Sequence, residues 1–233
     1  MCMPVVTAVS PFVAPIPPPR PRHRHEENLN ALTHALGLAA ASAGAMALIW
    51  TAARDGDRAQ LFGCAIYSVT LFAVYAASTL SHVFRRPRPR RALRVADQAA
   101  IFLFIAGSYT AVASTWLRGG NWWLLHAAVW GVALIGFTSK VVFSHRVDHG
   151  SVSTILYLIL GWLPILAARP ILATLPTNLL LWLAAGGFCY TIGVVFLLLD
   201  RRFFHAAWHA LVIAGSACHY LAILWCCTSA TIR

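Results

Sequence analysis

Charged residues divide the chain into seven long uncharged stretches of 20 or more residues each. As an α-helix, which rises ~1.5 Å per residue, each stretch can cross about 30 Å of hydrocarbon. Membrane β-strands are shorter and alternate apolar with polar residues, whereas these stretches are apolar on all sides. The pattern therefore predicts an all-α integral membrane bundle of seven transmembrane helices. The predicted helices cover approximately residues 32–53, 60–84, 97–117, 121–141, 150–168, 177–199 and 204–228.

The composition agrees with a membrane protein. Of the 233 residues, 59% are hydrophobic and 11% are charged, whereas roughly a quarter of the residues in a soluble domain are charged. Residues 1–25 are rich in proline and lack an uninterrupted apolar segment, so they are predicted to be a disordered cytoplasmic tail and not a cleavable signal peptide. Residues 26–233 then form the transmembrane domain. The six cysteines show no metal-type spacing and are interpreted as packing residues without disulfides.

The distribution of basic residues predicts the orientation in the membrane. Thirteen of the 18 Lys and Arg residues fall on the side of the tail, six of them within residues 84–94. Basic residues are enriched on the cytoplasmic side, so we expect a cytoplasmic N-terminus, an outer C-terminus and a multi-pass location in the inner (plasma) membrane. The formal net charge of +11 then reflects topology and contact with anionic membrane lipids, and no nucleic-acid partner is expected.

Five polar side chains are predicted to lie at similar depths near the cytoplasmic leaflet. His82, Asp97 and His205 each stand three residues inside a cationic boundary, ~4.5 Å along the helix. Ser78 and His209 are one turn deeper. The pairs Ser78/His82 and His205/His209 have i,i+4 spacing, so each pair points from one face of its helix. His34, at the start of the first predicted helix, belongs to the same leaflet.

Three imidazoles from two helices favour a metal site. Three nitrogen ligands with one open position are the arrangement of a catalytic zinc, although imidazole also suits iron and copper. The alternative is structural: histidines near a membrane surface bind water or headgroups, and Asp97 can pair with Arg94 or cap its helix. Ionisable groups inside a span are costly and usually functional. The spacing alone leaves both interpretations open.

Three other features predict helix packing. Pro164 is expected to kink the fifth helix, since proline lacks a backbone N–H. Gly186 and Gly193 are expected to permit close packing of the sixth helix. His219 lies ten residues beyond His209, ~15 Å along the helix, and is expected to form a hydrogen bond within the bundle.

Motifs along the chain resemble the hemolysin III family, the bacterial branch of the progestin and adipoQ receptor superfamily. They include EENLNALTHALG (26–37), YAASTLSH (75–82), ADQAAIFLFIAGSYTA (96–111) and HAAWHALVIAGSACHY (205–220). The resemblance implies a seven-helix bundle with a cytoplasmic N-terminus and Zn²⁺ held by His82, His205 and His209. It also implies that Asp97 positions the reactive water and that Ser78 is the serine of the same motif. Three residues depart from the family pattern: Ser81 stands where many members have Tyr, Gln98 where bacterial members often have His, and Ala111 where Pro is usual. None of these positions is a proposed ligand.

These residues support several functional hypotheses. The first is a zinc-dependent hydrolase of a lipid amide or ester bond, in which Asp97 orients or deprotonates water and Ser78 binds that water or the developing oxyanion. A structural zinc would instead tie the second helix to the seventh. The alternatives are a pore-forming or cytolytic membrane-active protein, a receptor or sensor, and a haem-binding protein. Substrate and oligomeric state are not predicted.

Overall fold

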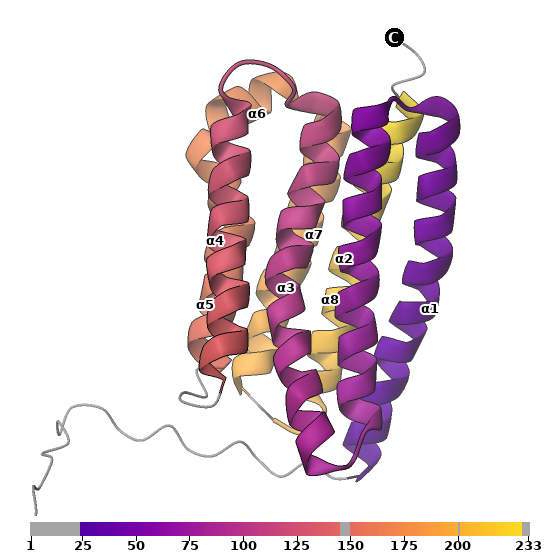
Figure 1. The fold of residues 1–233 in the computed structure, drawn as a ribbon, viewed down its shortest axis with the longest axis vertical. Helices are drawn as coiled ribbons and strands as arrows, with labels where there is room; N and C mark the ends of the chain where they lie inside the picture. Colours follow the sequence, from indigo (N-terminus) through magenta and orange to yellow (C-terminus); the bar gives the residue numbers. More distant parts are fainter. Residues whose placement is uncertain (1–23, 145–149, 200, 230–233) are drawn as a thin grey trace, which may run out of the picture.

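The computed structural model describes residues 24–144, 150–199 and 201–229, and within these residues the chain forms helices without strands (Figure 1). Among the described residues, seven spans are long and apolar enough to cross a membrane, which confirms the predicted seven-helix fold. The predicted disordered segment lies, up to residue 23, outside the described residues. The helices are α1 (Arg24–Asp55), α2 (Arg58–Val83), α3 (Pro87–Trp116), α4 (Trp122–Phe143), α5 (Gly150–Trp162), α6 (Ala168–Thr174), α7 (Thr177–Leu199) and α8 (Phe204–Ser229).

Two helices begin earlier than the hydropathy pattern predicts. α1 begins at Arg24 instead of residue 32, with Glu26 and Glu27 in its first turn, where the helix dipole favours negative charge. α3 begins at Pro87 instead of residue 97; proline is favoured at the first helical position because its missing N–H has no partner there. Charged residues mark the edge of the hydrocarbon, and the helices continue past it.

The fifth span is interrupted where proline was expected to kink it. α5 ends at Trp162, a 3₁₀ turn covers Leu163–Ala167, and α6 continues the same span to Thr174. Pro164 stands in the first turn of the 3₁₀ segment. Proline removes a backbone donor and clashes with the preceding turn, so an α-helix cannot run through this position unchanged.

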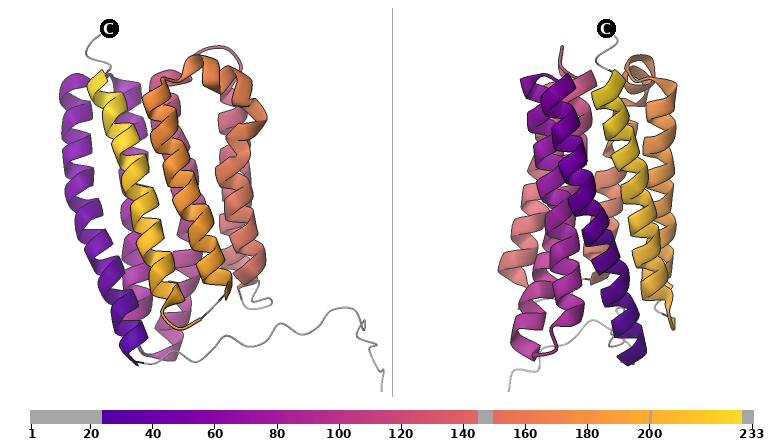
Figure 2. Two further views of the ribbon diagram at one scale, coloured as in Figure 1. Left: turned by 180° about the vertical axis from the view of Figure 1, so that it is seen from behind. Right: turned by 90° about the vertical axis from the view of Figure 1, so that its right-hand side faces the viewer.

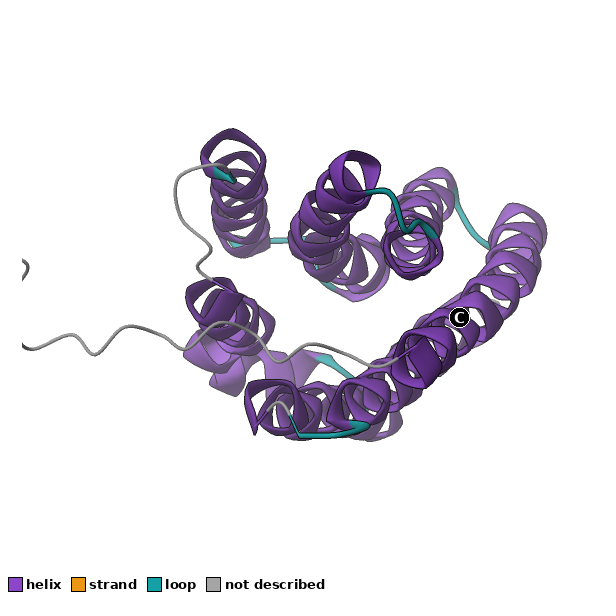
Figure 3. Ribbon diagram, turned by 90° about the horizontal axis from the view of Figure 1, so that it is seen from below, coloured by secondary structure: helices purple, strands orange, loops and turns teal. Residues whose placement is uncertain are grey.

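The spans form a closed ring of neighbouring helices (Figures 2 and 3). α1 contacts α2 and α8, α7 lies between α5 and α8, and α3 contacts α2, α4, α5 and α8. Close packing of α7 on α8 depends on glycine, as predicted. A Cβ atom at Gly186 would collide with the His219 ring, and one at Gly193 would lie 2.8 Å from Trp208. Because α1 contacts α8, the first and last spans are neighbours, and residues far apart in the sequence can share a site.

Candidate metal centre

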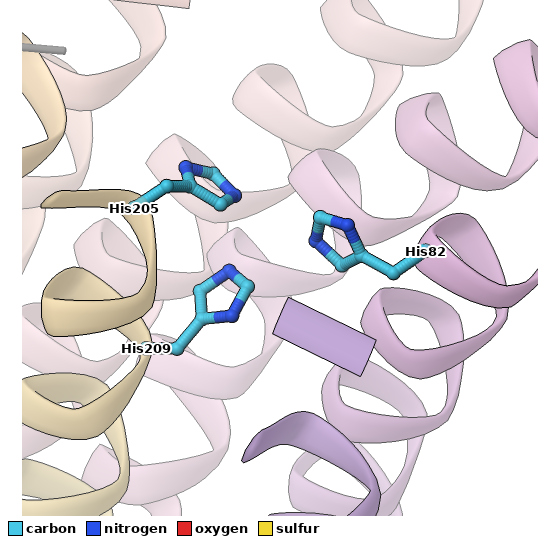
Figure 4. Close-up of side chains that lie close together, drawn as sticks. All are labelled: His82, His205 and His209. Atoms are coloured by element: carbon cyan, nitrogen blue, oxygen red, sulfur yellow. The ribbon is translucent and has the colours of Figure 1, made fainter. Parts of the chain in front are cut away.

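Three histidines come together at the end of the bundle where α8 begins. His82 lies in the last turn of α2, and His205 and His209 lie in the first two turns of α8. Each offers a ring nitrogen, and these three atoms lie within 4.8 Å of one another. Figure 4 shows the two α8 rings facing His82 across the gap between the helices. We call these residues the histidine cluster; its geometry allows it to hold a metal ion.

The start of α8 is held in place by α1. Phe203, directly before the helix, has a φ of 64°, a conformation that costs a bulky residue energy. Its backbone N–H donates a hydrogen bond of 3.1 Å to Oε1 of the buried Glu26. Because α8 begins at the next residue, this contact with α1 helps to fix where His205 lies.

A carboxylate of α1 orients His82. Oε2 of Glu27 lies 2.9 Å from Nδ1 of His82, and Oε1 of Glu27 lies 2.8 Å from the Arg90 guanidinium. An ionised carboxylate only accepts hydrogen bonds, so Nδ1 of His82 donates to it; in a neutral ring the lone pair is then on Nε2. Metal-binding histidines are commonly oriented in this way by a carboxylate that does not itself contact the metal. Arg90 in turn fixes the carboxylate.

His209 has a similar partner on α1. The Thr33 hydroxyl lies 3.2 Å from Nδ1 of His209 and within 3.0 Å of the Leu29 and Asn30 carbonyl oxygens. A hydroxyl has one hydrogen, which it donates to these carbonyls, so its oxygen accepts the Nδ1 hydrogen of His209. In a neutral ring with this hydrogen bond, the lone pair of His209 is on Nε2. In such a tautomer, Nε2 is the nitrogen that can bind a metal.

Asp97 and Ser78 lie on the wall of the same cavity as the histidine cluster. Ser78 is buried on α2, and Asp97 is half-buried on α3 beside the Ser78 hydroxyl. Arg94, the pairing partner considered for Asp97 from the sequence, lies near enough to act on Asp97 electrostatically, and its guanidinium lies 3.9 Å from Glu27. The other structural alternative, a helix cap, is wrong, because α3 begins ten residues before Asp97. Asp97 therefore lies within α3, not at its end, and lines the cavity.

The cavity has a volume of about 1660 Å³ and extends well beyond the histidine cluster. Most of its wall is apolar, from residues of α3, α5, α7 and α8. The arginines of α3, Arg90, Arg91 and Arg94, line it near the cluster, and His219 lines a deeper part. His219 Nε2 on α8 lies 3.3 Å from the Leu183 carbonyl oxygen on α7, which is the hydrogen bond within the bundle expected from the sequence. A large apolar cavity with a few convergent polar groups is the usual form of a small-molecule site.

Comparison with known proteins identifies the family. The model of the family described as Haemolysin-III related matches residues 22–220. The chain belongs to this family. It is 35% identical over 196 residues to Hemolysin-3 of Bacillus cereus, covering 84% of this chain and 89% of that protein. It is 34% identical over 198 residues to a Hemolysin-3 homolog of Bacillus subtilis (strain 168), covering 84% and 92%.

A more distant relative supports the wider superfamily. The chain is 30% identical over 167 residues to the human Monocyte to macrophage differentiation factor, covering 68% of this chain and 67% of that protein. This likeness supports the adiponectin receptor-like superfamily expected from the motifs. No solved structure matches the chain. The protein is thus a multi-pass membrane member of the haemolysin-III-related family.

All site residues of this haemolysin-III-related protein lie within the matched region. The structure brings together the predicted His82, His205 and His209 and places Ser78 and Asp97 on the same cavity. Sequence reasoning missed Glu27 and Thr33, and it placed His34 only by leaflet. The acidic and polar residues of the EENLNALTH segment were the available signal, but their role depends on how α1 packs against α2 and α8.

Proposed function

We propose that the protein is a zinc-dependent hydrolase that cleaves an amide or ester bond of a membrane lipid. The observation that carries the proposal is the histidine cluster, whose three nitrogen atoms lie within 4.8 Å of one another on the wall of a large apolar cavity. Three histidines with an open fourth position are a common donor set for catalytic zinc. The hydrogen bonds from Glu27 and Thr33 to two of the rings support this assignment.

The residues around the cluster can divide the chemistry of hydrolysis. Zinc, when bound, would lower the pKa of water to about 7 and polarise a carbonyl group. Asp97 would orient the attacking water and accept its proton, because its carboxyl lines the cavity from α3. Ser78, beside Asp97, would hold that carboxyl or bind the reacting oxygen.

The shape and charge of the cavity support an amphiphilic substrate. Apolar side chains of several helices line most of its wall, which suits an acyl chain. The arginines Arg90, Arg91 and Arg94 lie on the same side of the bundle as the histidine cluster, and basic residues are enriched on the cytoplasmic side of membrane proteins. We therefore place the reaction at the cytoplasmic leaflet of the plasma membrane, with membrane lipids as partners.

The first experiment measures metal content by mass spectrometry on detergent-purified protein. We expect about one zinc ion per chain in the wild type and its loss in His82→Ala and His209→Ala. His219→Gln is the matched control, because His219 lines the same cavity ~15 Å farther along α8 and should leave the zinc in place. A well-folded wild type without metal, prepared without chelators, would contradict the proposal.

Catalysis requires a second measurement on the metal-loaded protein. Release of fatty acid from a panel of ester- and amide-linked lipids should depend on metal and fall sharply in Asp97→Asn, with metal content retained. Zinc that is present at one ion per chain without any lipid hydrolysis would instead favour a structural zinc that ties α2 to α8.

A membrane-active function is the second candidate, favoured by the name Hemolysin-3 of the Bacillus cereus relative. It predicts efflux of a trapped dye from liposomes that contain the purified protein. Efflux that is unchanged in His82→Ala would separate this activity from the histidine cluster. Efflux no greater than from empty liposomes would exclude it.

A further inference from the structure

Two buried polar side chains of α1 have unused hydrogen-bonding atoms, and one of them, His34, lies next to the histidine cluster. His34 is 5% exposed and Asn30 is 1% exposed. Within the described residues, both ring nitrogens of His34 and the amide nitrogen of Asn30 lack a hydrogen-bond partner. Native proteins pair nearly all buried polar groups, and an unpaired one destabilises the fold. Three unused atoms on one helix face therefore point to a ligand that satisfies them.

The position of His34 shows where that ligand would lie. Its ring centroid is 3.9 Å from that of His209, with the rings nearly perpendicular at 87°, and 6.4 Å from that of His82. His34 lines the same cavity as both. It stands outside the histidine cluster, whose three ligand atoms are close to one another. A molecule that reaches the cluster through the cavity therefore passes within contact distance of His34.

We propose that His34, with Asn30 one turn before it on α1, forms an oxygen-binding subsite in which His34, on the cavity wall, donates to the carbonyl or carboxylate oxygen of an acyl group at the histidine cluster. A neutral imidazole has one N–H donor and an asparagine amide has two, whereas acyl oxygens accept hydrogen bonds. Asn30 lies one turn before His34, so the two side chains share a face of α1. The inference rests on the proposed function, since it names the group of the lipid that α1 recognises.

Among the helices around the site, α1 is the one that we expect to donate hydrogen bonds to the acyl oxygen. Asp97 on α3 and Ser78 on α2 form the side of the site that would handle water and its proton. Glu27 and Thr33 of α1 are already bonded to the histidine cluster. His34 lines the cavity beside the cluster and has unpartnered ring nitrogens, and Asn30, one turn away on α1, has an unpartnered amide nitrogen. Donors on α1 can therefore hold an acyl oxygen while Asp97 acts on the water from α3.

The experiment compares metal-loaded wild type, His34→Leu, His34→Phe and His34→Gln, with oleate as the probe. Oleate affinity is measured by isothermal titration calorimetry, metal content by mass spectrometry, and the thermal midpoint without ligand by a melting curve. His126→Leu is the matched control, because this partly buried histidine of α4 lines a second, smaller pocket and not the cavity of the histidine cluster.

We expect His34→Leu and His34→Phe to keep the metal, to melt at the wild-type temperature or higher, and to bind oleate about tenfold more weakly. His34→Gln, which keeps a donor, should recover part of that affinity, and His126→Leu should bind oleate as the wild type does. If either large apolar variant fails to fold, the other and His34→Gln carry the comparison.

Three results would overturn the inference, and they separate it from the proposed function. Unchanged oleate affinity in the His34 variants would show that His34 serves packing, with the hydrolase proposal intact. Loss of metal in those variants would make His34 a metal ligand instead. Wild-type protein that holds metal and does not bind oleate would overturn both the acyl substrate and this subsite.

Discussion

Side chains of α2 and α8 meet near both ends of the bundle, and the two meeting points differ in what surrounds them. At the α2 start, the sulfur atoms of Cys64 and Cys227 lie 3.4 Å apart, fully buried in the apolar core. At the other end, His82 meets His205 and His209 on the wall of a cavity. The same two helices thus close tightly around sulfur at one end and leave space around imidazole at the other.

The two ends also differ in how the polar atoms of their side chains are used. Cysteine is a small apolar side chain that a core can absorb without hydrogen bonds. Histidine is costly inside a membrane protein unless its nitrogens are used, and α1 contributes Glu27 and Thr33 to use one nitrogen of each of two rings. Both rings also line the cavity. The end with the histidine cluster thus has several polar side chains around a cavity, whereas the end with Cys64 and Cys227 is a packed apolar core.

The largest effect should come from removing the proposed metal. A chelator should lower the thermal midpoint of the wild type, because a ligand present at about a thousandfold over its Kd stabilises the fold by ~4 kcal/mol. His209→Ala should melt at the same temperature with and without chelator, whereas Cys227→Ala should still respond. Differential scanning calorimetry tests this comparison, and a chelator response that persists in His209→Ala would contradict the ligand assignment.

Glu27 should have the next largest effect, on metal affinity. Replacing it with Ala removes the acceptor for Nδ1 of His82, and loss of such an outer partner typically costs roughly 10- to 100-fold in metal affinity. Glu27→Gln keeps an acceptor oxygen and should fall between wild type and Glu27→Ala. Competition with a chromophoric zinc chelator measures the affinities.

The control for Glu27 is a carboxylate at the other end of the bundle. Asp55 forms an ion pair with Arg54 at 2.8 Å and lies far along α1 from the histidine cluster. Asp55→Asn should therefore leave zinc affinity unchanged. An equal loss of affinity in Asp55→Asn and Glu27→Gln would show a general effect of charge, and the orienting role of Glu27 would be wrong.

The cysteine end should respond in stability alone. Cys64→Ala removes a fully buried sulfur atom and should lower the free energy of unfolding by about 1 kcal/mol, with zinc content unchanged. The partly buried Cys189 provides the control, and Cys189→Ala should cost less. Thermal melting and metal analysis of the same samples separate the two readouts. Loss of zinc in Cys64→Ala would mean that the two ends are coupled.

The sequence was sufficient for the fold and for the histidine cluster, for physical reasons. A span of 20 or more uncharged residues is a local property, and the i,i+4 spacing of His205 and His209 fixes their common face. The basic residues at the helix ends predicted that His82 lies at a similar depth to His205 and His209. Helix ends were less predictable: α3 continues through an arginine-rich segment because solvated charges do not stop a helix that begins at Pro87.

The supporting residues depended on tertiary packing. Glu27 and His82 are 55 residues apart, and Thr33 and His209 are 176 apart. Their contacts depend on the rotation of α1 against α2 and α8, which the weakly patterned sequence of α1 does not specify. The unused donors of Asn30 and His34 are likewise visible only when every neighbour has been placed.

The smallest effect concerns an exposed counterpart of the Glu27–Arg90 pair. Asp57 caps the start of α2 by accepting the Gln60 N–H, and it pairs with Arg118 after α3. The Arg118 guanidinium and the cap lower the pKa of the Asp57 carboxyl. A lowered pKa stabilises the fold above the ordinary range of a carboxyl, and this contribution is lost as the pH falls through the folded-state pKa.

Because the Asp57 pair is exposed, Asp57→Asn, which keeps a capping oxygen, should cost less than about 1 kcal/mol. Asp57→Ala also removes the cap and should cost about 1 kcal/mol more. Neither should change zinc content, since an arginine-bound carboxylate supports a metal site only when it also holds a ligand. Melting curves from pH 7 down to pH 3 should converge for wild type and Asp57→Asn at the acidic end. If the thermal midpoints of wild type and Asp57→Asn instead change in parallel over this pH range, the Asp57–Arg118 ion pair does not contribute to stability. A carboxylate charge would then matter only at Glu27, beside the histidine cluster.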